Sequence, residues 1–443
     1  MASQQPQTAA APAPVASPGR WFYGWNVLAV ALFTAATSLG IVIGSFTFFA
    51  VAWIDEFDLS RGQVMLVLSA CQISGGFLFP VAGYLLDRYR IRWIGAIGLS
   101  FLAGGLALGS LASSLWHFFA IYTLLFAVAD TLAGTMLTKT LAVRWFRANQ
   151  GFALGIASMG TSTGILIFPP ITAFLLAEFG WRMAMLGLGA IALLVTLPLL
   201  LLVVRNDPAE KGVAPEPEGK IRKPSATDGE LWPTMKILRS RQFWFIVIAF
   251  LPLIEVTTGL SSNIGPYTQD LNIDTQRAAY LISLWSAMMI VGKLIFGALS
   301  DRIDLRILFF TGLTFFATAM VLLSLEPGYP LLLLTMVILG LAAGGQLPLI
   351  GVMISRHFGA AAFGSVMGMF YLCIRPVAFA APLAGWIRDT FGSYDYFWLG
   401  GLTIALVCAP VMLISGKSTE RNTETTSTRP DSASTRQKSE NNE

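Results

Sequence analysis

Charged residues are scarce in this sequence of 443 residues. Asp, Glu, Lys and Arg make up 12% of the chain, about half of the roughly 25% found in soluble proteins. Hydrophobic residues make up 55%, and the mean hydropathy is +0.67. This composition excludes an ordinary soluble enzyme. The formal net charge of +4 is too small to form the basic patch of a nucleic-acid-binding protein.

The sequence also has few residues suited to redox, metal or nucleophilic chemistry. The three cysteines, at 71, 373 and 408, each lie in an apolar run, which argues against a disulfide framework. The two histidines, His117 and His357, are far apart in the sequence. No phosphate-binding loop, dinucleotide fingerprint, nucleophile elbow or zinc signature is present. We therefore expect no enzyme activity, no cofactor and no metal site.

Long apolar segments dominate the chain. A transmembrane helix needs about 20 mostly apolar residues, and the segments are too continuously apolar for the alternating strands of a barrel. The sequence predicts an all-α integral membrane protein. Its twelve transmembrane helices are expected at 25–53, 63–86, 93–113, 117–142, 150–177, 181–204, 243–267, 278–299, 307–325, 330–355, 363–387 and 395–415.

The short loops between these segments alternate in charge. Basic residues gather at 87–92, 144–147, 301–306 and 356–357, whereas the intervening loops carry acidic residues. Because basic loops remain on the cytoplasmic side, both termini are predicted to be cytoplasmic in a multi-pass protein of the inner membrane. The expected organisation is a disordered tail at 1–20, a six-helix bundle at 21–205, a cytoplasmic linker at 206–240, a second six-helix bundle at 241–416 and a disordered tail at 417–443.

Two motifs occur twice in the chain. The Gly-x-x-x-Asp-Arg segment at 83–88 is repeated at 297–302. The segment at 144–155, with glycines at 151 and 155, is repeated at 356–368, with glycines at 364 and 368. Both motifs are shifted by nearly the same amount along the chain, which is hard to obtain by chance. This spacing predicts two bundles related by an axis along the membrane normal, with a site between them at mid-depth.

The repeated Gly-x-x-x-Asp-Arg loop resembles the signature of the major facilitator superfamily, although Arg90 stands where that family usually has glycine. The resemblance implies a gate at the cytoplasmic side. An Asp at a helix C-terminus opposes the helix dipole and needs a partner; the alternative is a charged loop that only sets topology. The residues implicated in gating are Asp87, Arg88, Arg92, Asp301 and Arg302.

Three further segments narrow this resemblance. They are Tyr-Gly-Trp at 23–25, Arg-Trp-Phe with its following glycines at 144–155, and Asn-Asp-Pro at 206–208. Together they resemble the branch that contains monocarboxylate transporters and oxalate–formate antiporters.

Five charged residues lie within the predicted membrane segments, where each costs roughly 2.5–3.5 kcal/mol on insertion scales. They are Asp130, Lys139, Glu255, Lys293 and Arg375. Lys139 is five residues from Arg144, so we expect it to snorkel to the cytoplasmic surface. Asp130 and Lys139 are nine positions apart and should point to opposite sides of a continuous helix.

The resemblance implies an anion site built on Lys293 and Arg375. In the resembling transporters an Arg at the position of Lys293 binds substrate carboxylate, and the antiporters use a basic pair on the eighth and eleventh helices. Helical spacing adds Trp285, Ser286, Met289 and Tyr371 as neighbours. The alternatives are structural ion pairs with Asp130 and Glu255, snorkelling of Lys293, and simple bundle packing for the four neighbours.

Asp130 and Glu255 are the candidates for proton coupling, because burial favours the protonated form of a carboxyl group. Each could instead be a permanently ionised partner of a base. The family's coupling Lys and Asp are absent, since the corresponding positions hold Ile43-Gly44 and Met289.

The sequence thus predicts a monomeric secondary transporter that moves a small organic carboxylate, mono- or dicarboxylate, through the lipid bilayer by alternating access. The partner is a small organic anion, with a proton if transport is symport, or a second anion if it is exchange. A drug or metabolite exporter with structural charges and a non-transporting membrane sensor are the alternatives.

Overall fold

The computed structural model describes residues 22–59, 61–212, 232–273, 275–325 and 328–415. These residues form helices joined by short loops, with no strand among them. The predicted tails at 1–20 and 417–443, and residues 213–231 of the predicted linker, lie outside the described residues.

The N-half, residues 24–203, contains the first six predicted crossings. Its elements are α1 (Gly24–Leu39), η1 (Gly40–Gly44), α2 (Phe46–Phe57), α3 (Arg61–Arg88), α4 (Ile91–Ser110), α5 (Leu115–Ala120), η2 (Ile121–Phe126), α6 (Ala127–Ala133), α7 (Thr135–Trp145), α8 (Gln150–Ser158), α9 (Gly160–Ala190), η3 (Ile191–Thr196) and α10 (Leu197–Val203).

The C-half, residues 241–415, contains the other six, and two short helices precede it. The elements are η4 (Pro208–Lys211), α11 (Thr234–Arg239), α12 (Arg241–Asp270), α13 (Thr275–Ser300), α14 (Leu305–Leu323), α15 (Tyr329–Phe358), α16 (Phe363–Cys373), η5 (Arg375–Phe379), α17 (Ala380–Phe391), α18 (Asp395–Cys408) and α19 (Val411–Ser415).

The helices confirm the predicted fold class. Within the described residues, 10 helices are long and apolar enough to cross a membrane. One of them, Gln150–Val203, accounts for two predicted crossings, because Gly180 adopts φ 74° and breaks it. The shorter apolar helix α16 continues through η5 into α17 and forms the eleventh crossing. These twelve crossings match the segments expected from sequence.

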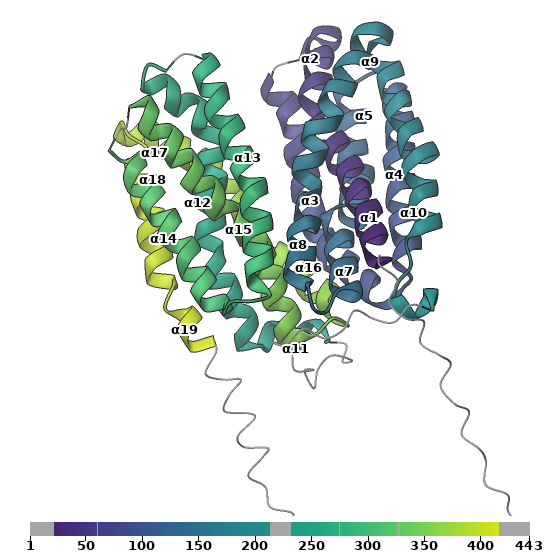
Figure 1. Cartoon of the computed structure of the whole chain (residues 1–443). Coiled ribbons are helices and arrows are strands. Elements are labelled where there is room, and N and C mark those ends of the chain that lie inside the picture. The colour runs from purple at the N-terminus through teal and green to yellow at the C-terminus, as the bar shows by residue number, and fades with distance from the viewer. Residues whose placement is uncertain (1–21, 60, 213–231, 274, 326–327, 416–443) are drawn as a thin grey trace, which may run out of the picture.

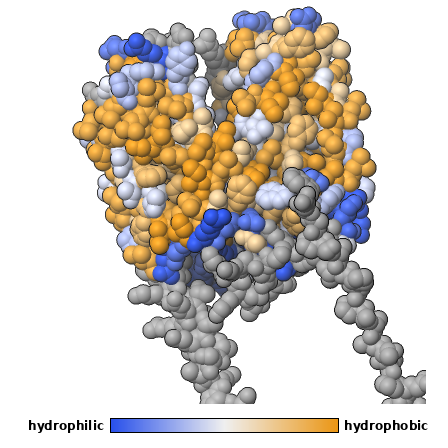
Figure 2. Space-filling model, viewed as in Figure 1, coloured by the Kyte–Doolittle hydropathy of each residue, from blue (hydrophilic) through white to orange (hydrophobic). Residues whose placement is uncertain are grey.

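The two halves stand side by side (Figure 1). The linker end of the molecule is the end at which α11 and α19 lie. A broad apolar surface covers the middle of the molecule, and hydrophilic residues collect at its two ends (Figure 2). Because hydrocarbon covers only the middle of a spanning protein, this surface fits a bilayer crossed by both halves.

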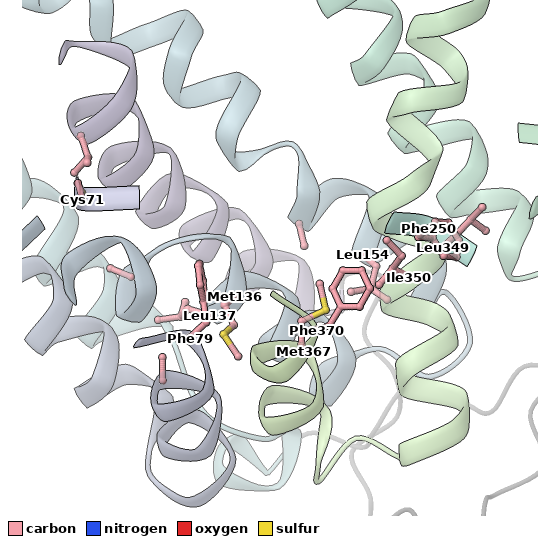
Figure 3. Packing of buried hydrophobic residues seen from close by; sticks show 14 of the residues in the cluster. Cys71, Phe79, Met136, Leu137, Leu154, Phe250, Leu349, Ile350, Met367 and Phe370 are labelled. Carbon is pink, nitrogen blue, oxygen red and sulfur yellow. The ribbon is translucent and has the colours of Figure 1, made fainter. Parts of the chain in front are cut away.

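The halves meet at the linker end. Across the halves α3 packs against α16, and α8 packs against α13 and α15. Figure 3 shows buried apolar side chains from both halves in this region, among them Met136 of α7 and Met367 and Phe370 of α16. Glycines allow the close approach: a Cβ on Gly83 would collide with the backbone of Gly364, and one on Gly151 would collide with Ser300.

We predict that Gly151→Val forces the linker end open, because the added side chain occupies the space now filled by Ser300. Ser355 provides the reporter, since it is buried and its hydroxyl donates to Gln150 Oε1 of the other half at 2.9 Å. In a background without native cysteines, a thiol reagent should label Ser355→Cys about tenfold faster when Gly151→Val is present, equivalent to about 1.4 kcal/mol.

Gly104→Val is the matched control, because a Cβ at Gly104 of α4 meets nothing within 4 Å. Equal labelling rates in the two variants would show that the glycine contacts do not hold the halves together.

Candidate functional site

The carboxylate of Asp87, at the end of α3, caps a helix of the other half. It accepts hydrogen bonds from the backbone N–H groups of Gly364 at 2.9 Å and Ser365 at 2.6 Å, where α16 begins. The first N–H groups of a helix lack partners within the helix and carry its positive dipole end. This contact supplies the partner that an Asp at a helix C-terminus needs.

Asp301 makes the equivalent contact at the end of α13. Its carboxylate accepts from the backbone N–H groups of Gly151 at 2.7 Å and Phe152 at 3.0 Å, at the start of α8 in the N-half. Asp87 and Asp301 hold the same place in the two copies of the first repeated motif, and Gly151 and Gly364 hold the same place in the two copies of the second. The internal repeat therefore builds the same cross-half contact twice.

Two arginines outside the predicted gating set bind the backbone at the ends of α3 and α13, beside Asp87 and Asp301. Arg144 donates to the backbone oxygens of Leu86 at 2.7 Å and Asp87 at 3.2 Å. Its repeat counterpart Arg356 donates to the backbone oxygen of Ser300. Both arginines begin the second repeated motif, so the repeat itself was the signal for them.

The other predicted gating residues make no such contact across the halves in the part of the chain that the structure describes. Arg88 is exposed and stacks over Tyr84 of its own helix at 4.8 Å. Arg92 lies over Trp93 at 5.7 Å. Arg302 is exposed at the linker end. A gating role of Arg88, Arg92 and Arg302 stays a prediction, which concerns contacts formed in another conformation.

Lys293 of α13 is buried at the interface between the halves. Its side chain is 4% exposed, and its ammonium donates to Ser162 Oγ of α9 at 2.9 Å. The absence of a side chain at Gly155 allows the helices to approach, since a Cβ there would lie 2.5 Å from the carbonyl oxygen of Lys293. The alternative that Lys293 snorkels to the surface is therefore wrong.

Arg375 begins η5, the 3-10 segment that interrupts the eleventh crossing. Its Nη1 donates to the backbone oxygen of Gln72 in α3 at 3.0 Å, and its guanidinium lies 5.0 Å from the ring centre of Phe79. A Cβ on Gly76 would lie 2.7 Å from the Arg375 side chain. Its Nε is buried without a hydrogen-bond partner among the described residues.

The two cations occupy corresponding contacts of the repeat. The shift that relates the first motif to its copy also relates Phe79 to Lys293, and the shift that relates the second motif to its copy relates Ser162 to Arg375. The Lys293–Ser162 contact and the Arg375–Phe79 contact thus join equivalent positions in the two copies of the repeat. The cation lies on α13 in one copy and on η5 in the other. The repeat therefore places one cation at each of the two equivalent sites between the halves.

The prediction that Lys139 snorkels to the surface is wrong. Lys139 is 0% exposed, and its ammonium donates to Tyr371 Oη of α16 at 2.8 Å. Gly134, with ψ −157°, separates α6 from α7. The helical phase restarts at this break, so the direction of Lys139 could not be counted from Asp130 along one continuous helix.

The two intramembrane carboxylates differ in their surroundings. Asp130, half-buried on α6, is attracted electrostatically to Arg375. Glu255, half-buried on α12, forms no hydrogen bond or ion pair within the described part of the chain. Neither carboxylate forms an ion pair with Lys293 or Arg375, so the alternative of structural ion pairs finds no support.

In the described structure, of the four residues predicted to lie beside Lys293 and Arg375, Tyr371 contacts the site and the other three do not. Tyr371 is bonded to Lys139 and stacks on Phe79 with ring centres 4.7 Å apart. On α13, Trp285 is buried, Met289 is half-buried and Ser286 is exposed. No hydrogen bond or ring contact among the described residues joins these three side chains to Lys293 or Arg375.

The site as a whole carries excess positive charge. Lys139, Lys293 and Arg375 come from both halves, and Asp130 is a carboxylate that interacts with Arg375. Lys139 and Lys293 repel each other. Each cation is bonded to a neutral oxygen, from Tyr371, Ser162 and Gln72 respectively.

The sequence model of the Major Facilitator Superfamily matches residues 28–382 and, in a second match, residues 255–438. The chain belongs to the Major Facilitator Superfamily. It is therefore a multi-pass membrane transporter rather than an enzyme, and its partner is a small molecule.

Curated relatives support the monocarboxylate transporter branch. Monocarboxylate transporter 12 of Rattus norvegicus is 25% identical over 434 residues, which cover 92% of this chain and 88% of that protein. Monocarboxylate transporter 13 of the same species is 26% identical over 407 residues, covering 90% and 88%. The MFS-type transporter YcxA of Bacillus subtilis is 24% identical over 398 residues, covering 87% and 91%.

Solved structures agree on the fold. The proton:xylose symporter XylE has a TM-score of 0.66 at 16% identity, covering 88% of this chain and 95% of that one. A bacterial homologue of the iron transporter ferroportin, in an outward-facing state, has a TM-score of 0.66 at 14% identity, covering 89% and 99%. At these identities the likeness concerns the fold alone.

We predict that Asp87→Asn and Asp301→Asn each favour opening of the linker end. Each change removes a charge-assisted contact to helix N–H groups, and hydrogen bonds to charged groups contribute about 1.5–3 kcal/mol. Labelling of the Ser355→Cys reporter should accelerate roughly tenfold or more in each variant.

Asp304→Asn is the control, because Asp304 caps only its own helix through the backbone N–H of Arg306 at 2.8 Å. If all three variants label at the same rate, the carboxylate caps do not close the linker end.

Proposed function

We propose that this transporter moves a small organic carboxylate, mono- or dicarboxylate, across the inner membrane by alternating access. One observation carries the proposal: three cations meet between the halves with one carboxylate near them, and each is bonded to a neutral oxygen. Uncompensated charge is costly inside a membrane protein. A bound anion neutralises it.

Lys293 and Arg375 are the proposed primary anion ligands. A lysine ammonium has three donors and an arginine guanidinium has five, and the described hydrogen bonds use one donor of each. The remaining donors can bind a carboxylate, and Arg375 offers the planar fork suited to bidentate contact. One ion pair at about 4 Å contributes about 4 kcal/mol at an effective dielectric of roughly 20.

The charged loops support a cytoplasmic linker end and cytoplasmic termini. The basic residues at 87–92, 144–147, 301–306 and 356–357 lie at the end where the halves are in contact, and basic loops remain in the cytoplasm. The conformation is then closed toward the cytoplasm. We infer that Asp87 and Asp301 act as the gate, because substrate release to the cytoplasm requires both caps to break.

Asp130 is the stronger candidate for proton coupling, and exchange of two anions is the alternative. Protonation of Asp130 would remove a negative charge that interacts with Arg375, so proton binding and anion binding would influence each other. Glu255 lacks such a link to the cations in the described structure. We propose that the transporter acts as a monomer, since each chain contains both halves and the site between them.

We predict that the purified protein in liposomes takes up labelled carboxylates, and that Lys293→Gln or Arg375→Gln raises KM at least about tenfold, because each removes an interaction of about 1.4 kcal/mol or more. Pyruvate, lactate, oxalate and longer acids form the panel.

Arg388→Gln is the matched control for charge, because Arg388 pairs with Asp270 at 2.7 Å on the exposed surface. If no acid in the panel is transported and Arg375→Gln moves another solute normally, the exporter alternative replaces the carboxylate carrier.

We predict that a pH gradient alone drives carboxylate accumulation, and that Asp130→Asn abolishes this accumulation while carboxylate exchange continues. The neutral amide cannot carry a proton between the two sides. The measurement is uptake after a pH jump, beside counterflow of preloaded acid in the same liposomes, with Glu255→Gln tested in parallel. Accumulation that persists in Asp130→Asn would exclude Asp130 as the coupling residue, and no accumulation in the unmodified protein would indicate anion exchange.

A further inference from the structure

Lys139 is a buried cation that the primary anion site does not use. Its side chain is 0% exposed, and its described hydrogen bond goes to the neutral hydroxyl of Tyr371. The ammonium also lies 5.4 Å from the centre of the Tyr371 ring. A buried lysine without a carboxylate partner is poorly stabilised, because one neutral acceptor does not replace its hydration.

Lys139 and Arg375 come from opposite halves, and each lies at or near a break in its helix. The fourth crossing is interrupted at Gly134, five residues before Lys139, and the eleventh is interrupted by η5, which begins with Arg375. Interrupted helices at membrane depth occur where the backbone is buried in protein or lines a cavity, and in transporters they form the substrate site. Both breaks therefore mark the same region between the halves.

A chain of ring contacts joins the two cations. Lys139 is bonded to Tyr371, Tyr371 stacks on Phe79 at 4.7 Å, and Arg375 lies over the same Phe79 ring at 5.0 Å. Lys139 and Lys293 also repel each other electrostatically. Lys139 is thus linked to Arg375 through the two rings and to Lys293 through charge.

The charge balance of the site then favours a dianion. With Asp130 ionised, the three cations leave a surplus of two positive charges. A monocarboxylate neutralises one of them, whereas an acid with two carboxylates neutralises both.

We propose that Lys139 is a third anion-binding residue, which exchanges the hydroxyl of Tyr371 for the second acidic group of a dicarboxylate held by Lys293 and Arg375. The exchange is favourable because an ammonium–carboxylate contact adds the attraction between opposite charges, which the neutral hydroxyl of Tyr371 does not supply. Tyr371 keeps the ammonium in place when no anion is bound. This inference rests on the proposed carboxylate transport.

The test compares butanedioate with butanoate, which have the same chain length and differ by one carboxylate. Binding is measured by calorimetry on the full-length protein in nanodiscs. Lys139→Gln should weaken butanedioate binding about tenfold to a hundredfold, corresponding to about 1.4–2.8 kcal/mol, and should change butanoate binding less than about threefold. Retained butanoate binding shows that the variant is folded.

Two further variants sharpen the result. Thr140→Val is the matched control, because Thr140 is the next buried residue of α7 and bonds only within its own helix, to Met136 at 2.9 Å; both affinities should stay unchanged. Lys139→Arg keeps the charge on a longer side chain, so it should shift the preference from butanedioate toward the shorter propanedioate.

Equal weakening of both acids by Lys139→Gln, no weakening at all, or an unchanged length preference in Lys139→Arg would overturn the role of Lys139. A separate outcome, in which the unmodified protein binds neither acid, would overturn the proposed function itself.

Discussion

Positive charge buried between two halves of a membrane protein must be neutralised, and the site is organised around this constraint. Lys139, Lys293 and Arg375 come from three different crossings, and each is bonded to a neutral oxygen rather than to a carboxylate. Such an arrangement is weakly stabilised without an anion and strongly stabilised with one. The same imbalance that would be a defect in a static core is what a carrier of organic anions requires.

The carboxylate caps and the cation contacts follow from one duplicated interface. The contact of α3 with α16 and that of α13 with α8 are copies, each closed by a carboxylate on helix N–H groups and by glycines at the point of closest approach. Each copy also has one buried cation. Arg375 contacts Phe79 in one copy, and Lys293 contacts Ser162 in the other. Breaking the caps would therefore change the surroundings of both cations together, which connects the site to opening at the linker end.

The fold was largely predictable from sequence because apolar length and loop charge are local properties. The twelve crossings could be found in this way. The repeat was visible as two motifs that recur with nearly the same shift, whereas Asp87, Lys293 and Arg375 were singled out by resemblance to a known family and, for the two cations, by charge within apolar segments. The burial of Lys139 could not, because the break at Gly134 resets the helical phase that the prediction assumed to be continuous. The contacts of Asp87 and Asp301 with the opposite half depend on how the two halves dock, which no local pattern specifies. Arg144 and Arg356 contact backbone oxygens within their own halves, and their matching places in the repeat were the sequence signal for them.

The most direct test of the account is a cryo-electron microscopy structure of the protein in nanodiscs with a bromine-substituted dicarboxylate, whose heavy atom marks the anion. The account predicts density for the acid between the halves, with carboxylate oxygens within about 3 Å of nitrogen atoms of Lys293 and Arg375. Density at any other place, or an empty site in which Asp130 pairs directly with Arg375, would contradict it.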